Sequence, residues 1–341
     1  MLTERQIKVL KAIVEEFGLT ALPVGSRVLS KKNELNFSAA TIRNDMADLE
    51  ELGYIEKTHT SSGRIPSQKG YRYYVDFIVP QVPIETTPDV GVFEQLLTQK
   101  QLERELAVKE ALKILSNLTN YTSIFLGPSL GQSRVKKIQF VPITDQQTVL
   151  ILITDQGHVE SRTITLPNNI NVAVMESIIK ALDELLVGTL VNEVQTKLTE
   201  SFEHQLHDFV SYKDEILYTV IQLLTQSLQN NNYILSGTSN ILKQPEFNDI
   251  DKVSHLYDMI EADEFIKVIE MVETTEQQLT VRIGQENEIK AMENCTLITV
   301  PYKINEQEYG KLALLGPTRM EYQKIIPLLE YVARIMSDLY R

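Results

Sequence analysis

One segment, residues 38–53, holds the side chains whose types and spacing point most directly to a chemistry. Its apolar residues recur every three or four positions, which predicts a helix that Ser38 caps and Gly53 ends. The inward positions are Ile42, Met46, Leu49 and Leu52. Because each residue turns a helix by about 100°, four other residues face outward near its start. They are Ala40, Thr41, Arg43 and Asn44.

This outward face has the chemistry of DNA recognition. Small residues allow a helix to approach a groove closely, an arginine suits guanine or phosphate, and an asparagine suits adenine. The free N–H groups at the helix start, where Ser38 stands, also favour a phosphate. Any amphipathic helix has a polar face, so an ordinary solvated helix stays open at this point. Thr41, Arg43 and Asn44 could each meet a phosphate or a base.

A basic segment follows this helix. Residues 57–75 contain four basic side chains and no acidic one. Residues 54–57 and 64–66 are predicted as the strands of a hairpin whose turn, 58–63, is rich in small polar residues. Such a hairpin can lie along a phosphate backbone or enter the minor groove, although many polar hairpins are only solvated turns. The candidate DNA contacts here are Lys57, His59, Thr60, Ser61, Ser62 and Arg64.

Two further helices are predicted ahead of these segments. Thr3 and Gln6 form a capping box before an apolar stripe, and Gly18 is expected to end that helix. Ser26 opens a short second helix. Helix, helix, helix and hairpin in this order predict a winged helix-turn-helix at the N-terminus.

The charge distribution agrees with a polyanion partner for the N-terminal part alone. The chain has 341 residues and a net charge of −13. Residues 1–78 carry 11 Lys and Arg against 10 Asp and Glu, a net charge of +1, so the other 263 residues carry −14. A hydrophobic content of 43% excludes a disordered chain, and a single cysteine excludes an internal disulfide framework. The absence of a membrane-length apolar run and of a signal-peptide pattern leads us to expect a soluble, cytoplasmic protein.

The remainder of the chain is predicted as an α+β domain with an insertion. Residues 80–88 are a linker candidate. Helices are expected at 93–117, within 173–230, at 253–272 and at 322–339, and strands at 137–142, 148–154, 158–165, 233–237, 279–283, 296–304 and 310–315. The long helical stretch between the strand groups indicates an inserted helical unit, whose apolar surface a partner subunit would bury.

Several motifs resemble the HrcA family of heat-inducible transcription repressors. The likeness is nearly continuous over residues 22–77 and returns at 309–322. The segments that carry it are VGS at 24–26, SAATIRNDMADLEELGY at 38–54, HTSSGRIPS at 59–67, GYRYYVD at 70–76 and YGKLALLGPTRMEY at 309–322. Ser62 stands where alanine is more usual in the family.

The resemblance implies a winged-helix domain, a GAF-like domain and a dimerising domain inserted into the latter. We place these at 1–78, at 99–165 with 233–341, and at 166–232, with a linker at 79–98. It further implies a homodimer that binds double-stranded DNA at an inverted-repeat operator, CIRCE, before chaperone operons. The GroE chaperonin is the implied partner that keeps the repressor active. We expect no cofactor, no metal, no membrane partner and no enzymatic activity.

Other signals are weaker. A G-x-S-x-G pattern at 127–131 lacks the helix that a nucleophile elbow needs, and His204 and His207 lack a third metal ligand. Cys295 lies in an apolar strand and is expected to be buried. Tyr71, Tyr73 and Tyr74 are expected to pack against the core of the N-terminal domain, although stacking on bases is open to them.

Three alternative functions stay open from the sequence. A GAF-like domain could sense a metabolite, which would make the chain a ligand-controlled repressor. The acidic body could instead be an enzyme with an appended DNA-binding module. A third alternative is an oligomeric scaffold whose N-terminal domain binds protein.

Overall fold

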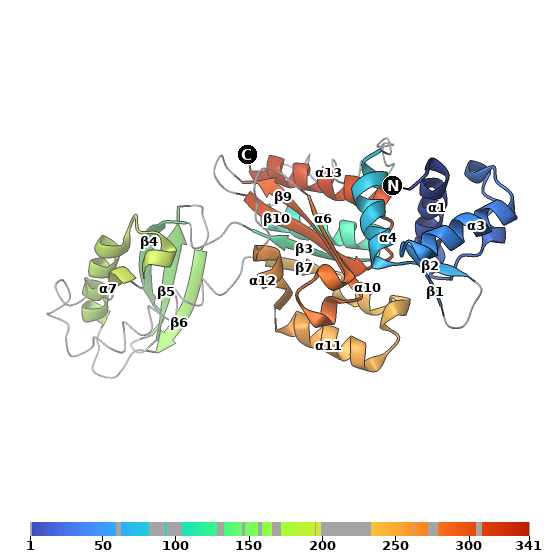
Figure 1. Ribbon diagram of the computed structural model, residues 1–341. Coiled ribbons are helices and arrows are strands. Elements are labelled where there is room, and N and C mark those ends of the chain that lie inside the picture. Colours follow the sequence, from blue (N-terminus) through green and yellow to red (C-terminus); the bar gives the residue numbers. More distant parts are fainter. Residues whose placement is uncertain are drawn as a thin grey trace. The chain divides into compact units, whose positions relative to one another are not determined.

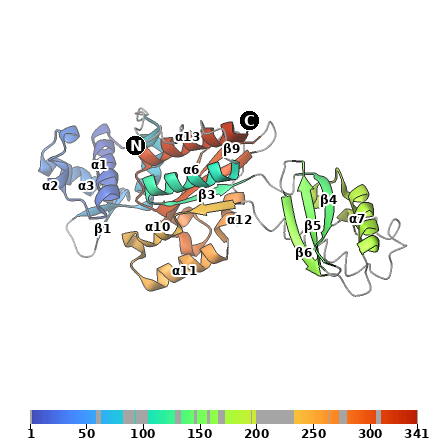
Figure 2. The ribbon, with the colours of Figure 1, turned by 180° about the vertical axis from the view of Figure 1, so that it is seen from behind.

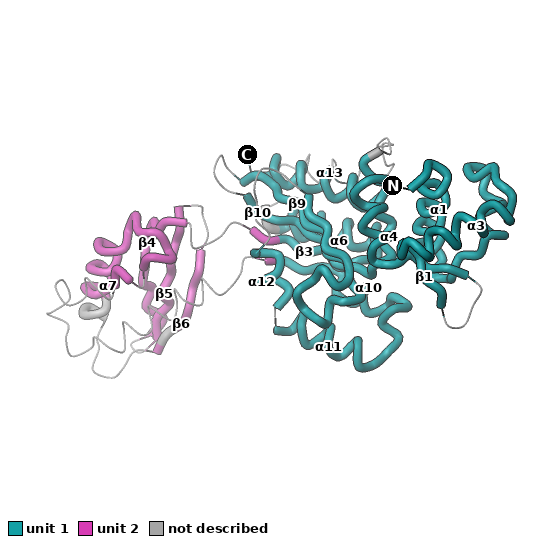
Figure 3. The backbone as a smooth tube through the Cα atoms, in the orientation of Figure 1, with its two compact units in different colours: residues 1–125, 234–341 teal, residues 126–233 magenta. Residues whose placement is uncertain are grey.

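The computed structural model describes residues 2–58, 63–81, 93, 104–127, 133–144, 147–155, 159–165, 172–194, 196–198, 233–262, 264–271, 279–304 and 309–340. The chain forms two compact units (Figure 3). The first joins residues 1–125 to residues 234–341, and the second comprises residues 126–233.

The first unit begins with the predicted three helices and hairpin (Figure 1). These are α1 (Glu4–Thr20), α2 (Ser26–Leu29), α3 (Ala39–Glu51), β1 (Ile55–Lys57) and β2 (Arg64–Pro66). The capping box between Thr3 and Gln6 is present, which confirms the predicted start of α1. The helix continues two residues past Gly18, to Thr20, and ends where Ala21 adopts a left-handed conformation with φ 53°.

The hairpin is attached to the rest of the winged helix by backbone hydrogen bonds. In the antiparallel pair, Ile55 lies opposite Pro66 and Lys57 opposite Arg64. Val24 exchanges two backbone hydrogen bonds with Arg64, of 2.8 and 2.9 Å, and so adds a third short segment beside β2. The chain then enters α4 (Gln68–Tyr73), which continues as one π-helical stretch (Tyr74–Ile78) and a 3₁₀ turn (Val79–Gln81).

A five-stranded sheet forms the α+β part of the first unit, with the order β7-β3-β10-β9-β8. Its strands are β3 (Thr122–Leu126), β7 (Tyr233–Ser236), β8 (Thr280–Ile283), β9 (Cys295–Lys303) and β10 (Tyr309–Pro317). Strand β3 was not predicted from the sequence. All five of its residues are buried, and a short run without alternating polar positions carries no strand periodicity to detect.

Helices cover this sheet on both sides. Helices α6 (Arg104–Thr119) and α13 (Tyr322–Tyr340) lie on one face, as Figure 2 shows, and α10 (Thr238–Leu242), α11 (Ile250–Glu261) and α12 (Glu264–Met271) lie on the other side. The helix predicted at 253–272 is therefore two helices. The buried Lys311 on β10 donates from Nζ to the carbonyl oxygens of Ile269 and Glu270, at 2.8 and 2.7 Å, and so caps the end of α12.

The second unit corrects the predicted boundary of the insertion. Its strands β4 (Val135–Pro142), β5 (Gln147–Thr154) and β6 (Val159–Thr165) pair only with one another in the part of the chain described, in the order β4-β5-β6, and α7 (Val172–Leu186) packs on β4. Short connections let consecutive strands pair directly, so these strands form their own sheet instead of extending the five-stranded one. The insertion thus begins near residue 126, not 166, and it is not wholly helical. The later part of the predicted 173–230 helical stretch, residues 199–232, lies outside the described residues.

Candidate nucleic-acid interface

Helix α3 presents the outward face that its sequence predicts. Ala40, Arg43 and Asn44 are exposed and Thr41 is half-buried. Opposite them, Ile42, Met46 and Leu49 are buried in the core of the winged helix. The prediction that Leu52 points inward was wrong: its side chain is 47% exposed, because α3 ends at Glu51 and Leu52 is already the cap residue.

The start of α3 is arranged to receive an anion. The exposed Ser38 accepts a hydrogen bond from the backbone N–H of Thr41 at 3.1 Å, and its Oγ lies 2.9 Å from Oγ1 of Thr41. The other N–H groups of a first helical turn have no partner within the helix, and the helix dipole places partial positive charge there. A phosphate of the DNA backbone is therefore a fitting ligand for this end.

Charge changes sign along α3. Arg43 forms no ion pair or hydrogen bond with any residue that the structure describes. The acidic residues all stand in the second half of the helix: Asp45, Asp48, Glu50 and Glu51. Because carboxylates repel phosphates, only the first half of α3 can approach DNA closely. Contact through the N-terminal residues is the usual docking mode of a recognition helix.

An ion pair between a half-exposed arginine and a buried aspartate fixes α3 against α1. Arg5 donates from Nε to Oδ2 of Asp45 at 2.7 Å and from Nη2 to Oδ1 at 3.0 Å. The Asp45 side chain is only 2% exposed. The hydrogen bond and the charge of Asp45 raise the pKa of Arg5 above its usual value. This pair could not be predicted from the sequence, because its partners lie 40 residues apart and share no motif.

The base of the predicted wing is tied to the end of α3. Arg64 contacts Oε2 of Glu50 through Nε at 2.8 Å and Nη2 at 2.6 Å, with a side chain 15% exposed. Lys57 lies 3.8 Å from the same carboxylate and is 65% exposed. Arg64 thus positions the hairpin, whereas the Lys57 ammonium can still reach a phosphate. The predicted wing-tip residues, His59, Thr60, Ser61 and Ser62, lie outside the described residues.

Two residues after the hairpin close the carbonyl end of α3. Ser67 donates to the carbonyl oxygen of Gly53 at 2.6 Å, and Lys69 donates to that of Leu52 at 2.8 Å. The Lys69 ammonium also lies 4.5 Å from the ring centre of Tyr54. Lys69, one of the four cations of the basic segment, therefore serves the helix end.

Among the weaker signals, the three tyrosines and Cys295 lie in the described residues and pack as the sequence predicts. Tyr71 and Tyr74 are buried in the core, as predicted, and Tyr73 is half-buried with its ring centre 5.4 Å from that of Tyr54. Cys295 is fully buried, and that burial raises the pKa of its thiol to about 12. The G-x-S-x-G serine, Ser129, and both histidines of the possible metal pair lie outside the described residues.

Across the described ranges, no three His, Cys, Asp or Glu side chains gather in a way that could hold a metal ion. None of the helices described is long and apolar enough to cross a membrane.

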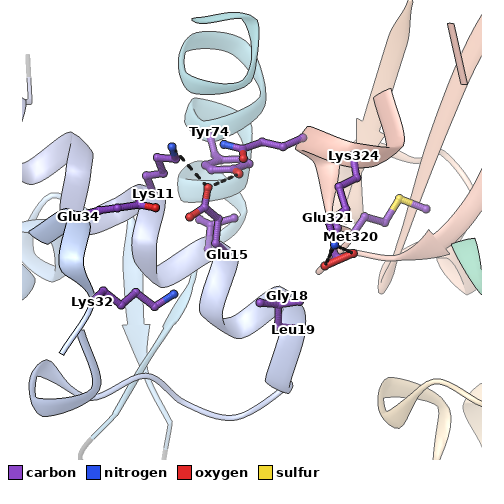
Figure 4. A pocket seen from close by; sticks show the side chains of 12 residues that line it. Lys11, Glu15, Gly18, Leu19, Lys32, Glu34, Tyr74, Met320, Glu321 and Lys324 are labelled. Atoms are coloured by element: carbon purple, nitrogen blue, oxygen red, sulfur yellow. Dashed lines mark hydrogen bonds and ion pairs between the residues drawn. The ribbon is translucent and has the colours of Figure 1, made fainter. Parts of the chain in front are cut away.

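A cavity of about 270 Å³ opens beside the winged helix (Figure 4). Lys11 and Glu15 of α1 and Tyr74 line one side, and Glu321 and Lys324 at the start of α13 line the other. The Tyr74 hydroxyl donates to Oε1 of Glu15 at 3.3 Å. Loss of solvent around Glu15 is the main cause that raises the pKa of its carboxyl, which Lys11 and the Tyr74 hydrogen bond partly offset.

The raised pKa of Glu15 predicts a pH-dependent stability. A carboxyl whose pKa is higher in the folded than in the unfolded state favours folding at acidic pH, and that contribution is lost as the pH rises through the folded pKa. We therefore expect Glu15→Gln to increase the free energy of unfolding relative to the wild type, by an amount that grows from acidic to neutral pH. Urea denaturation across that range measures the difference.

Glu16→Gln is the matched control for this prediction. Glu16 is the next residue on α1, and its carboxylate forms a 2.7 Å ion pair with Lys32. Its replacement removes that pair, so the Glu16 variant should be slightly less stable than the wild type at neutral pH. A Glu15 variant that loses stability on going from acidic to neutral pH as steeply as the wild type would contradict the assignment.

Comparisons with known proteins agree with this architecture. A family model described as the HrcA protein C terminal domain matches residues 105–326. The heat-inducible transcription repressor HrcA of Bacillus pumilus (strain SAFR-032) is 42% identical over 338 residues, which cover 99% of this chain and 98% of that protein. A crystal structure of a hypothetical protein is 26% identical with a TM-score of 0.68, and the match covers 100% of this chain and 99% of the other. By both the family model and the identity to this relative, the chain belongs to the HrcA family.

Proposed function

We propose that this chain is a repressor of heat-inducible chaperone operons that binds a CIRCE-type inverted-repeat operator as a cytoplasmic homodimer. The observation that carries the proposal is the first half of α3, where Ala40, Arg43 and Asn44 are exposed and no acidic side chain intervenes. The name of the B. pumilus relative supports repression of heat-inducible genes. This function is binding and needs no catalytic group.

The proposed contacts divide by their placement. Ala40, Thr41, Arg43 and Asn44 would enter the major groove, while Ser38 and the N–H groups beside it would hold a phosphate. Lys57 and the wing-tip residues 59–62 would contact the backbone or the minor groove. Two such domains related by a two-fold axis require a palindromic site, because the symmetry of the protein must match that of the operator.

The sheet topology supports a role for the GroE chaperonin. Strands β3 and β7 are neighbours in the sheet, yet the whole second unit lies between Leu126 and Tyr233 in the chain. Non-local strand pairing slows folding and leaves apolar edges exposed for longer. A repressor with this topology would depend on a chaperonin to reach its active state, and a shortage of free chaperonin during heat shock would lower the amount of active repressor.

The proposal predicts steep salt dependence of operator binding. A dimer that makes on the order of 6–10 phosphate contacts should lose about 10³–10⁵ in affinity between 50 and 200 mM salt. A mobility-shift series with the full chain, an inverted-repeat operator and a scrambled duplex of equal length measures this, with and without GroE. We expect specific binding that GroE increases.

Other outcomes of the same series would reject the proposal. Binding that ignores salt and is equal for both duplexes would exclude sequence-specific repression through α3. Specific binding that GroE leaves unchanged would retain the repressor but remove the chaperonin from the mechanism.

A further inference from the structure

The winged helix is joined to the sheet of the first unit by side chains at the edges of their contact, here called the seam. On one side, Nε2 of Gln68 donates to the carbonyl oxygen of Ile283 at 3.2 Å, and Oε1 of Gln68 accepts from the backbone N–H of Gln285 at 3.2 Å. Both ends of this amide are thus engaged, one by the last residue of β8 and the other by the turn that follows it.

Arg72 forms a second connection on the same side of the seam. Its Nη2 donates to the carbonyl oxygen of Val281 at 2.6 Å and also contacts Glu286, to which Nε donates at 2.9 Å. Glu286 in turn accepts from the backbone N–H of Ile283 at 2.9 Å. The bidentate geometry fixes the direction of the Arg72 guanidinium as well as its distance.

Arg319 holds the other side of the seam and lies between β10 and α13. It is only 8% exposed, and Nη1 donates to the carbonyl oxygen of Gly18, near the end of α1, at 2.9 Å. Two residues that follow α10 hold its other nitrogens. Nη2 donates to Oε1 of Gln244 at 2.9 Å, and Nε donates to the carboxylate of Glu246. Gly18 is therefore bound to a guanidinium that is itself immobilised.

An aromatic cluster fills the centre of the seam. The rings of Tyr71 and Tyr74 lie 6.1 and 6.3 Å from the ring of Tyr322, all three buried. The Tyr322 hydroxyl donates to the carbonyl oxygen of Thr318 at 2.6 Å. One hydrophobic core therefore runs from the winged helix into the sheet domain. The winged helix is therefore packed directly against the sheet domain, and this packing sets its orientation relative to the sheet.

We propose that Arg319, Arg72 and Gln68 are positioning residues that set the operator spacing this repressor accepts. Arg5 and Asp45 fix α3 to α1, and Arg319 fixes the end of α1 to the sheet domain, so these contacts set the direction of the recognition helix relative to the five-stranded sheet. The inference rests on the proposed function, because only a dimer on an inverted repeat has a spacing to read.

The geometry of DNA makes the dependence of affinity on spacer length a sensitive measure of how firmly the recognition helices are held. One added base pair moves a half-site by about 3.4 Å and rotates it by about 34–36°, since B-DNA has 10–10.5 base pairs per turn. Clamped recognition helices cannot follow that rotation, whereas helices on loosened domains can. Breaking the seam should therefore flatten the dependence of affinity on spacer length, an effect that a general loss of stability would not produce.

The test compares operators whose central spacer is shortened or lengthened by one base pair. We expect the wild type to lose at least about 10-fold in affinity on either altered operator. A Gln68→Ala, Arg72→Ala double variant and an Arg319→Ala variant should each lose less than about 3-fold relative to their own affinity for the natural spacer. Arg334→Ala, an exposed arginine on α13, is the charge-matched control and should keep the wild-type profile.

Two further outcomes distinguish a failure of the spacing inference from a failure of the proposed function. Arg319→Ala leaves the Glu246 carboxylate without its partner. If thermal melting shows that this variant is unfolded, the double variant, whose side chains lie on the more exposed side of the seam, carries the test by itself. A folded seam variant with the wild-type spacing profile would overturn the inference alone. A wild type without preference for the inverted repeat would overturn the proposed function, and the inference with it.

Discussion

Arg43→Ala is expected to weaken operator binding by about 1–3 kcal/mol per half-site, and so by about 2–6 kcal/mol for a dimer whose two half-sites add. Arg43 is exposed on the first half of α3 and has no ion-pair partner among the described residues. Its removal should therefore leave the free energy of unfolding unchanged. Mobility shifts on the inverted-repeat operator and urea denaturation measure the two quantities separately.

Arg43→Lys distinguishes the two partners that Arg43 could have on DNA. A lysine keeps the charge but loses the bidentate fork. If Arg43 reads a guanine, Arg43→Lys should be nearly as weak as Arg43→Ala, and the discrimination against a mutated base should relax. If Arg43 contacts a phosphate, Arg43→Lys should retain most of the affinity, and Arg43→Ala should reduce the salt slope by about one per half-site.

Arg334→Ala controls for the net charge of the chain. It removes one exposed arginine from α13, away from the recognition helix, so operator affinity should not change. An Arg43→Ala variant that binds operator as tightly as the wild type would exclude Arg43 from the interface and leave the proposed docking of α3 without its main cation.

The recognition face of α3 could be predicted because its evidence is local. The inward positions Ile42, Met46 and Leu49 recur at helical spacing, and this periodicity alone assigns the opposite side to solvent. The caps Thr3 and Ser38 are likewise read within a few residues of the helices they start. The prediction for Leu52 was wrong because periodicity does not show at which residue the last turn of a helix ends.

The contacts that orient this face could not be predicted, because their partners are distant in the chain. Arg5 and Asp45 are 40 residues apart, and Arg319 lies 301 residues from Gly18. The motif at 309–322 signalled that Arg319 belongs to the family pattern, but nothing near it in sequence indicates a bond to α1. The boundary of the insertion was missed for a related reason: strand pairing decides which sheet a strand joins, and pairing is not periodic.

Gly70→Ala is expected to have the largest effect on the fold of the winged helix. A Cβ atom at Gly70 would lie 2.1 Å from the carbonyl oxygen of Tyr54, which is backbone and already accepts a hydrogen bond from the N–H of Ser67 at 3.0 Å. Relief requires α4 to move away from the start of β1. Such overpacking costs about 1–3 kcal/mol or more, against a gain of about 1 kcal/mol in helix propensity.

Gly18→Ala is the matched control, because Gly18 is also a helical and buried glycine. Its Cβ would meet the carbonyl oxygen of Arg319 at 3.4 Å, an ordinary contact, so this variant should be as stable as the wild type or more stable by up to about 1 kcal/mol. Both variants gain the same helix propensity, so the difference between their free energies of unfolding, measured by urea denaturation, reports the cost of the clash at Gly70. Equal stability of the two variants would show that α4 and β1 accommodate a Cβ atom at position 70 without a clash, and would contradict this prediction.

The displacement caused by Gly70→Ala should also reach the DNA. Tyr54 immediately precedes β1, and α4 carries Gln68 and Arg72 of the seam, so a shift between them moves both the hairpin and the docked orientation of the recognition helix. We therefore expect operator affinity to fall further than the loss of stability explains, even under conditions where the variant is fully folded. Arg43→Ala removes one DNA contact and leaves the seam intact. Gly70→Ala should also flatten the dependence of affinity on operator spacing, because it loosens the seam itself.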